Sequence, residues 1–205
     1  MPALPLRTDA FVLLKRPPSD AFQTLTVFSP VHGALLVLQR LVQKAAAAAP
    51  ALDLFDEAAL DLESSNQGQT WFLREARLLA RHPGLGRSYD TLRLASALTT
   101  LIARNPVPEE GRAAVAALLR TAFAAFAAGA RPDIVWFKSL YRFARDQGYP
   151  LKEQWFPTQT AADREALAIL VNRPLAAQSA PAGQVDRLAV RLAEYLRGHT
   201  EIIVD

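Results

Sequence analysis

Cationic side chains are the residues of this chain whose types and spacing best fit a chemical task. Lys138, Arg142 and Arg145 recur at positions i, i+4 and i+7, so a helix would place them on one face. A second cluster, Arg74, Arg77 and Arg81, lies near the junction of the strand region and the helical region. Such stripes can contact phosphates and displace counterions, although the solvent-exposed face of an ordinary helix shows the same pattern.

Side chains that make or break bonds are sparse in this sequence. None of the three histidines, His32, His82 and His199, has a second histidine at metal-ligand spacing. Cysteine is absent, which excludes a thiol nucleophile, a thiolate metal site and a disulfide. The sequence also lacks a Gly-rich phosphate loop and a Gly-x-Ser-x-Gly motif. We therefore expect no catalytic residue, no metal and no cofactor.

Length and composition are those of an ordinary globular protein. The chain has 205 residues, of which 51% are apolar and 21% are charged, enough for one or two domains with a real core. No apolar run approaches the roughly 20 residues that cross a bilayer. The first residues lack the charged and then apolar segments of a secretory signal. We expect a cytoplasmic protein with no membrane partner.

The first 80 residues show the pattern of short strands separated by turns. The clearest strands are Phe11–Leu14, Phe22–Phe28, which alternates, and Ala34–Leu38. Leucines at even spacing between residues 51 and 62 indicate further strand, with Asp56–Glu57 as a solvated break rather than a metal site. Residues 70–77 predict a fifth strand, or a strand that runs into a helix. Four or five short strands in this length fit a small closed or partly open barrel.

The remainder of the chain has helical periodicity. Apolar residues at three-to-four spacing predict helices over residues 88–103, 110–128, 132–147, 161–171 and 185–196. The short apolar segment Ile202–Val204 could dock on the surface. The expected fold is α+β, with a β-barrel domain at residues 1–80 and an all-α domain at residues 81–205.

Charge is distributed unevenly between these two parts. Residues 1–74 carry six Lys/Arg and seven Asp/Glu, a net charge of −1, whereas residues 75–205 carry seventeen and thirteen, a net charge of +4. The strand region also contains four aromatic residues that could stack on nucleic-acid bases or fill the core: Phe22, Phe28, Phe55 and Trp71.

The order and the amino-acid sequences of several segments resemble those of the bacterial DNA repair protein RecO family. The similar segments are Phe11–Pro17, Leu25–Pro30 followed by His32–Gly33, Trp71–Ala76, and Phe137–Phe143 followed by the turn Gly148–Pro150. The resemblance runs in register over nearly the whole chain. The proline of the last turn comes one place earlier than in the family's Gly-Tyr-x-Pro pattern.

The resemblance implies an N-terminal OB-fold followed by a helical domain without catalysis. Proteins of this family bind single- and double-stranded DNA, anneal complementary strands and support recombinase loading together with RecR. We accordingly expect a nucleoid-associated protein of DNA repair and recombination. The expected path of the DNA strand uses Lys15, Arg16, Arg40, Lys44, Arg74 and Arg77. Lys138, Arg142 and Arg145 would bind DNA or the acidic tail of the single-stranded-DNA-binding protein.

Three departures from the family pattern keep an alternative open. The cysteines that bind zinc in many members are missing after Pro150, so no zinc is expected. After the third strand, Arg40 and Lys44 lead into the run Ala45–Ala49 where basic residues are usual. The net charge of the strand region is also slightly negative. The alternative is a protein-interaction module with the RecO shape that has lost strong DNA binding. A third possibility, an enzyme, would need titratable groups clustered in a cleft.

Overall fold

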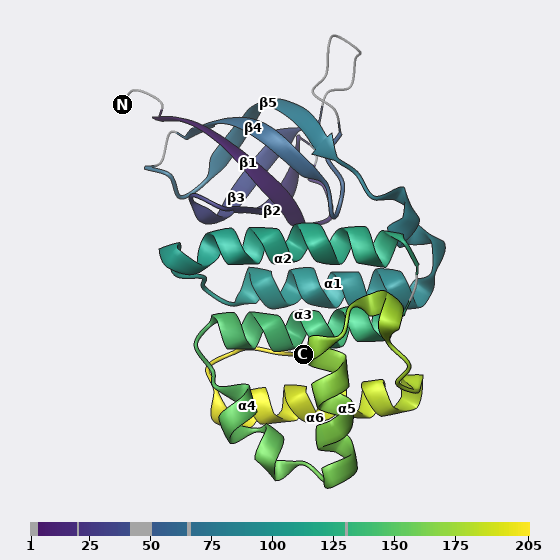
Figure 1. The fold of residues 1–205 in the computed structure, drawn as a ribbon. Coiled ribbons are helices and arrows are strands. Elements are labelled where there is room, and N and C mark those ends of the chain that lie inside the picture. The colour runs from purple at the N-terminus through teal and green to yellow at the C-terminus, as the bar shows by residue number, and fades with distance from the viewer. Residues whose placement is uncertain (1–3, 20, 42–50, 65–66, 130) are drawn as a thin grey trace. The chain divides into compact units, whose positions relative to one another are not determined.

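The computed structural model describes residues 4–19, 21–41, 51–64, 67–129 and 131–205. In these residues five strands precede six α-helices, so the α+β class is confirmed (Figure 1). The strands are β1 (Leu4–Lys15), β2 (Phe22–Ser29), β3 (Gly33–Arg40), β4 (Glu57–Ser64) and β5 (Trp71–Ala80). The α-helices are α1 (Tyr89–Arg104), α2 (Glu109–Ala127), α3 (Pro132–Asp146), α4 (Leu151–Gln154), α5 (Ala161–Asn172) and α6 (Ala182–His199). Short 3-10 segments are η1 (Pro83–Arg87), η2 (Phe156–Thr158) and η3 (Leu175–Ala177).

Internal contacts divide the chain into two compact units. The first comprises Met1–His82 and Ile102–Leu119, and the second comprises Pro83–Leu101 and Arg120–Asp205. The first unit thus holds all five described strands together with parts of α1 and α2, which the sequence assigned to the helical domain. None of the described helices is long and apolar enough to cross a bilayer.

The strands form one sheet whose pairing order is β1-β2-β3-β5-β4 and returns from β4 to β1. All pairs are antiparallel except β3 and β5, which run parallel. Phe11 is the point where β1 changes partner, because residues before it pair with β4 and residues after it pair with β2. β1 and β4 pair from Leu4 to Phe11, whereas β3 meets β5 at only two described residue pairs.

Alternation along the strands builds the core of the first unit. In β2 the side chains of Gln23, Leu25 and Val27 are buried, whereas Phe22 and Thr24 on the other face are only half-buried. The inward side chains form one apolar cluster of Ala10, Val12, Leu25, Val27, Val37, Leu52, Ala58, Leu60, Leu62 and Trp71. Because side chains of a strand alternate between its two faces, this cluster also determines which residues face outward.

The prediction of a solvated break at Asp56–Glu57 was wrong. Asp56 is only 1% exposed, and β4 begins directly after it at Glu57. The carboxylate of Asp56 accepts a hydrogen bond from Arg81 Nε at 2.8 Å and another from the backbone N–H of Asp53, also at 2.8 Å. Phe55, which precedes Asp56, takes a positive φ of 69°. A buried carboxylate needs such a partner because an unpaired buried charge is strongly unfavourable.

The turn between β2 and β3 is attached to the part of α2 that belongs to the first unit. Arg112 donates a hydrogen bond from its guanidinium to the carbonyl of Val31 at 2.6 Å. Gly33 at the end of this turn has a φ of +72°, and a Cβ at Gly33 would lie 3.2 Å from Arg112 Nε. Glycine is favoured here because it adopts positive φ without strain and leaves room for the arginine.

The second unit contains the long amphipathic helices α3 and α6, which pack against each other. The N-terminus of α5 is fixed by Asp163, which is 4% exposed and accepts hydrogen bonds from Arg187 and Arg191 at 2.8 Å each. The C-terminal segment docks as expected, since Ile202 and Val204 are buried.

The Asp56–Arg81 pair yields a stability prediction. Substituting Asp56→Ala removes the acceptor of the Asp53 backbone N–H and the carboxylate partner of Arg81, which keeps only its hydrogen bond to Ala51 O. The change should lower the free energy of unfolding by about 2–3 kcal/mol. Urea denaturation followed by circular dichroism measures the loss. The control is Asp53→Asn, because Asp53 forms an exposed ion pair with Lys15 and should change stability by less than about 1 kcal/mol. Equal losses for both variants would contradict the assignment.

The Asp163 cluster predicts a pH-dependent contribution to stability. The hydrogen bond from Arg187 holds the pKa of Asp163 below its usual value, although burial acts in the opposite direction. The charged carboxylate therefore stabilises the folded state above about pH 3.9, the unfolded pKa, and this contribution is lost as the pH falls through the lower folded pKa. We expect Asp163→Asn to reduce the free energy of unfolding by about 1–2 kcal/mol at pH 7.

Denaturation at pH 7, 5 and 3 tests the sign of this effect. The difference between the wild type and Asp163→Asn should be full at pH 7 and 5 and smaller at pH 3. The exposed Asp186 on α6 provides the control Asp186→Asn. A difference that grows on acidification would refute the assigned role of Asp163.

Candidate functional site

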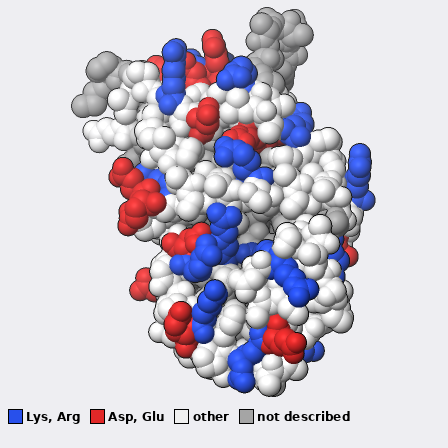
Figure 2. All heavy atoms as spheres, viewed as in Figure 1, with Lys and Arg blue, Asp and Glu red and all other residues white. Residues whose placement is uncertain are grey.

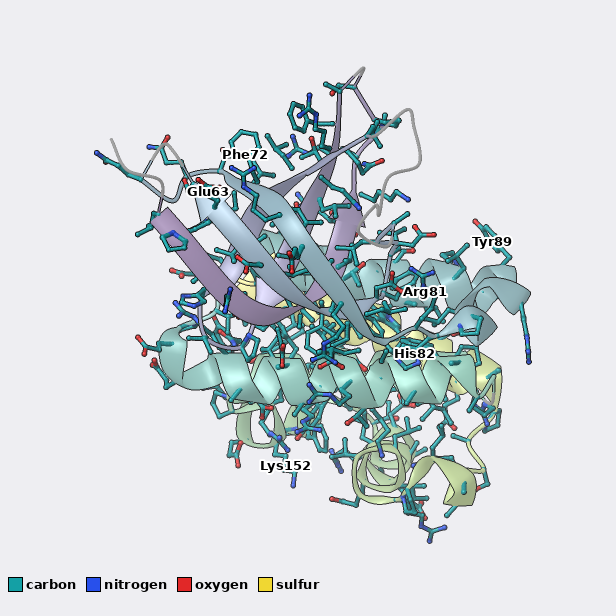
Figure 3. All side chains as sticks on the ribbon, turned by 90° about the horizontal axis from the view of Figure 1, so that it is seen from above. Glu63, Phe72, Arg81, His82, Tyr89 and Lys152 are labelled. Atoms are coloured by element: carbon teal, nitrogen blue, oxygen red, sulfur yellow. The ribbon has the colours of Figure 1, made fainter. Side chains whose placement is uncertain are left out.

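An aromatic groove with arginines at its rim lies on the outer surface of the sheet. Its volume is about 330 Å³, and it is lined by Phe22, Leu38, Arg40, Glu63, Phe72, Leu73 and Arg74. These residues come from β2, β3, β4 and β5, all within the first unit. Glu63 and Phe72 lie next to each other in Figure 3, as their cross-strand pairing requires.

The strand register brings the groove residues together. Phe22 is the cross-strand partner of Arg40, and Leu38 is the partner of Phe72. The rings of Phe22 and Phe72 are in edge-to-face contact, with centroids 5.8 Å apart. Trp71 points into the core, so its neighbour Phe72 must point outward. The groove therefore depends on the same alternation that builds the core.

The charge of this surface is positive although the strand region as a whole is not. Arg16 donates its backbone N–H to Thr24 O at 3.0 Å. Thr24 pairs with Leu38, and Leu38 pairs with Phe72, so these four residues form one row across the strands. Arg16 and Arg40 are exposed and form no ion pair within the described part of the chain. Arg74 is paired with Glu63. The described groove and its rim thus hold three arginines and one carboxylate.

The other residues expected on the strand path lie apart from this groove or are already engaged. Lys15 forms an ion pair with Asp53 at 3.1 Å. Arg77 is exposed, but it lines a different hollow of the same unit. Lys44 and the alanine run that follows it lie outside the described residues. The structure therefore brings together Arg16, Arg40 and Arg74 from the predicted set.

The basic face of α3 is largely neutralised by neighbouring groups. Arg142 and Arg145 both form ion pairs with Asp146, at 3.5 and 2.6 Å. Lys138 is half-buried and donates a hydrogen bond to Arg173 O at 2.7 Å, and burial lowers the pKa of its amine. This face consequently offers less free positive charge than its sequence indicates.

Most of the candidate stacking aromatics are in the interior. Phe28, Phe55 and Trp71 are 1%, 5% and 6% exposed, so a base in solvent cannot reach their ring faces. Phe22 alone of the four lines the groove, and its partner there, Phe72, was not selected from the sequence. The sequence could have indicated Phe72, because side chains alternate along a strand and a buried Trp71 places its neighbour on the outer face.

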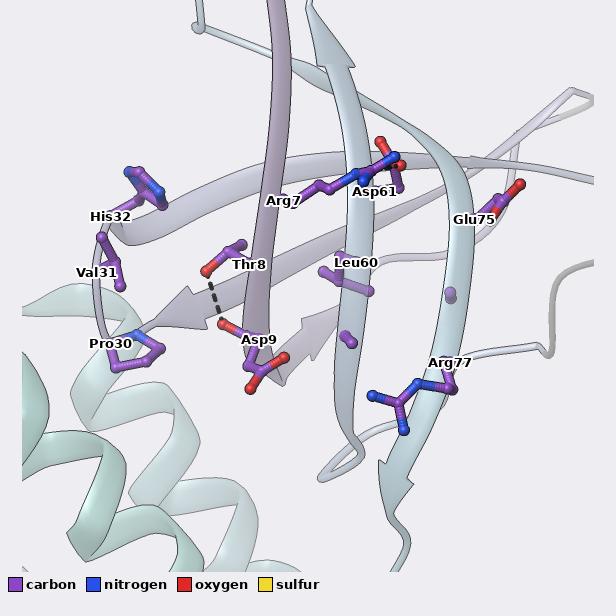
Figure 4. Close-up of a pocket in the computed structure, with 12 residues that line it drawn as sticks. Arg7, Thr8, Asp9, Pro30, Val31, His32, Leu60, Asp61, Glu75 and Arg77 are labelled. Carbon is purple, nitrogen blue, oxygen red and sulfur yellow. Dashed lines mark hydrogen bonds and ion pairs between the residues drawn. The ribbon is translucent and has the colours of Figure 1, made fainter.

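A second hollow of about 700 Å³ lies beside the N-terminal half of β1 (Figure 4). On the face drawn in Figure 2, Lys and Arg side chains are interspersed with Asp and Glu and do not form one continuous positive field. Among the described residues, no group of three or more His, Asp or Glu is placed to hold a metal ion.

Comparison with known proteins leaves the chain without an assigned family. No protein-family model matches it, and no curated protein sequence is similar to it at a significant level.

Proposed function

We propose that this chain is a RecO-like recombination mediator whose outer groove binds single-stranded DNA. Two features support the proposal. The strand order β1-β2-β3-β5-β4, with β3 parallel to β5, agrees with an OB-fold-like barrel. OB-folds bind oligonucleotides on the face of their second and third strands, where Phe22 and Arg40 lie here. The segments that resemble the RecO family lead to the same function.

The observation that carries the proposal is the contact between Phe22 and Phe72 beside three arginines. Bases stack on aromatic rings without strict sequence preference, and arginines neutralise the phosphates of the same strand. The edge-to-face contact leaves no gap between the two rings, so a base would stack on an outer ring face and not between them. Arg16 and Arg40 are free to contact phosphates, whereas Arg74 must first separate from Glu63.

The wider role follows from the resemblance and is part of the proposal. The protein would bind double-stranded as well as single-stranded DNA, anneal complementary strands and act with RecR in recombinase loading. The acidic tail of the single-stranded-DNA-binding protein would contact Lys138, Arg142 and Arg145 by displacing Asp146. The ion pairs at Asp146 weaken this face for DNA and for an acidic tail alike. The alternative is a protein-interaction module without strong DNA affinity, and the same binding experiment distinguishes the two functions.

Fluorescence anisotropy with a labelled oligothymidylate tests the groove directly. We expect Phe72→Ala to weaken binding by about 5- to 150-fold, since each stacked base contributes about 1–3 kcal/mol. Arg40→Ala should weaken binding and reduce the slope of log K against log salt by about 0.7, the effect of one lost phosphate contact on a single strand. The matched controls are Tyr89→Ala and Arg93→Ala, because both residues are exposed on α1 in the second unit.

Two outcomes would decide against the groove. If the wild type fails to bind the oligonucleotide at low salt, the interaction-module function replaces DNA binding. If Tyr89→Ala weakens binding as much as Phe72→Ala, the DNA lies elsewhere on the protein. Circular dichroism of each variant excludes unfolding as the cause.

Removing the single carboxylate of the groove should have the opposite effect. Glu63→Gln releases Arg74 from its ion pair and makes the groove more positive, so single-stranded DNA should bind about 2- to 5-fold more tightly with a salt slope steeper by about 0.7. Glu75→Gln is the control, because Glu75 follows Arg74 on β5 but lines the other hollow. Weaker binding by Glu63→Gln would show that the carboxylate contacts the ligand and does not merely compete for Arg74.

A further inference from the structure

Glu63 is the one carboxylate among the described residues that line the aromatic groove. Its side chain is only 30% exposed, and it shares the groove with the arginines that would neutralise phosphates. Like charges placed side by side disfavour binding, so a carboxylate weakens the groove as a site for phosphates alone. A single strand also presents its bases, and a carboxylate is better matched to a base edge than to the backbone.

The ion pair with Arg74 leaves part of both side chains unused. Arg74 Nε and Nη2 both contact the same carboxylate oxygen, Glu63 Oε2. Within the described part of the chain, Glu63 Oε1 accepts no hydrogen bond and Arg74 Nη1 donates none. The pair therefore keeps one acceptor and one donor for a ligand, which can use both without breaking the ion pair.

The strand register places this pair beside a stacking surface. Glu63 is the direct cross-strand partner of Phe72, so their Cβ atoms lie about 4.5–5.5 Å apart (Figure 3). The contact with Phe22 leaves the outer ring face of Phe72 for a base. The edge of a base stacked on that face would lie within reach of Glu63 and Arg74, which line the same groove.

Guanine has the base edge that best fits an acceptor beside a donor. Its N1–H and its N2 amino group are neighbouring donors, and O6 next to them is an acceptor. Adenine and cytosine have one amino donor beside a ring nitrogen that accepts, and thymine has one N–H between two carbonyl oxygens. A carboxylate accepts hydrogen bonds only, so it repels the acceptor that adjoins the donor in these three bases.

We propose that Glu63 and Arg74 make the groove selective for guanine at the position where a base stacks on Phe72. Glu63 Oε1 accepts hydrogen bonds from N1–H and the N2 amino group, and Arg74 Nη1 donates to O6. Arg16 and Arg40 bind the phosphates of the same strand, which carry no sequence information. This selectivity rests on the proposed binding of single-stranded DNA and adds a base preference to it.

Fluorescence anisotropy with the full chain tests the preference against a labelled oligothymidylate of 15 nucleotides. Replacing its central thymine by guanine should tighten binding about 5-fold or more, the effect of one specific base contact. Adenine or cytosine at the same position should change the affinity by less than about twofold. Hypoxanthine, which lacks the N2 amino group of guanine, should bind less tightly than guanine.

The variant Glu63→Gln should reduce the gain from guanine to less than about twofold, while its affinity for oligothymidylate stays at least that of the wild type. Glu75→Gln is the matched control and should keep the full gain, because Glu75 lines the other hollow.

The two probes separate failure of the base preference from failure of the proposed function. If neither oligonucleotide binds, DNA binding by the groove is refuted and the base preference with it. If oligothymidylate binds but guanine gives no gain, only the base preference is refuted. An equal gain from adenine, equal affinity for guanine and hypoxanthine, or a gain that persists in Glu63→Gln would also overturn the roles of Glu63 and Arg74.

Discussion

The change of partner at Phe11 determines the organisation of the strands. The first part of β1 pairs with β4 and the last part pairs with β2, and the change of neighbour occurs at one residue. The arrangement closes the pairing order without a sixth strand. The outward faces of β2, β3 and β5 lie on one surface because β3 pairs with both β2 and β5.

Strands and helices were predicted well where interactions between residues close in the sequence determine them. The alternation of Phe22–Phe28 indicated both the strand and its two faces, and the helices begin and end within a few residues of their expected limits. The start of β1 was missed because residues 4–10 lack a regular apolar pattern. These residues are extended because they pair with β4, whose partner residues are 48 to 60 positions away in the sequence. Asp56 was misassigned for a related reason, since its partner Arg81 is twenty-five residues away.

The arginines of the candidate site could be predicted from the sequence, but the way the fold groups them with Phe72 could not. Arg40 and Arg74 could be selected because arginine binds phosphate wherever the fold exposes it. Their grouping with Phe72 requires the parallel pairing of β3 and β5, which no local pattern shows. The pairing of Arg142 with Asp146 was available from the sequence, because residues four apart share a helix face. The remaining ion pairs, such as Lys15 with Asp53, depend on the folded loop.

The hydrogen bond from Arg112 to Val31 has a consequence for dissecting the protein into fragments. Ile102–Leu119 groups with the strands, so a fragment that ends at residue 82 would lack the guanidinium that holds the β2–β3 turn. The limits of this unit also fall inside α1 and α2, where the backbone is continuous helix. A shortened chain that retains the turn in its native form must extend to Leu119 and carry residues 83–101 as an insertion.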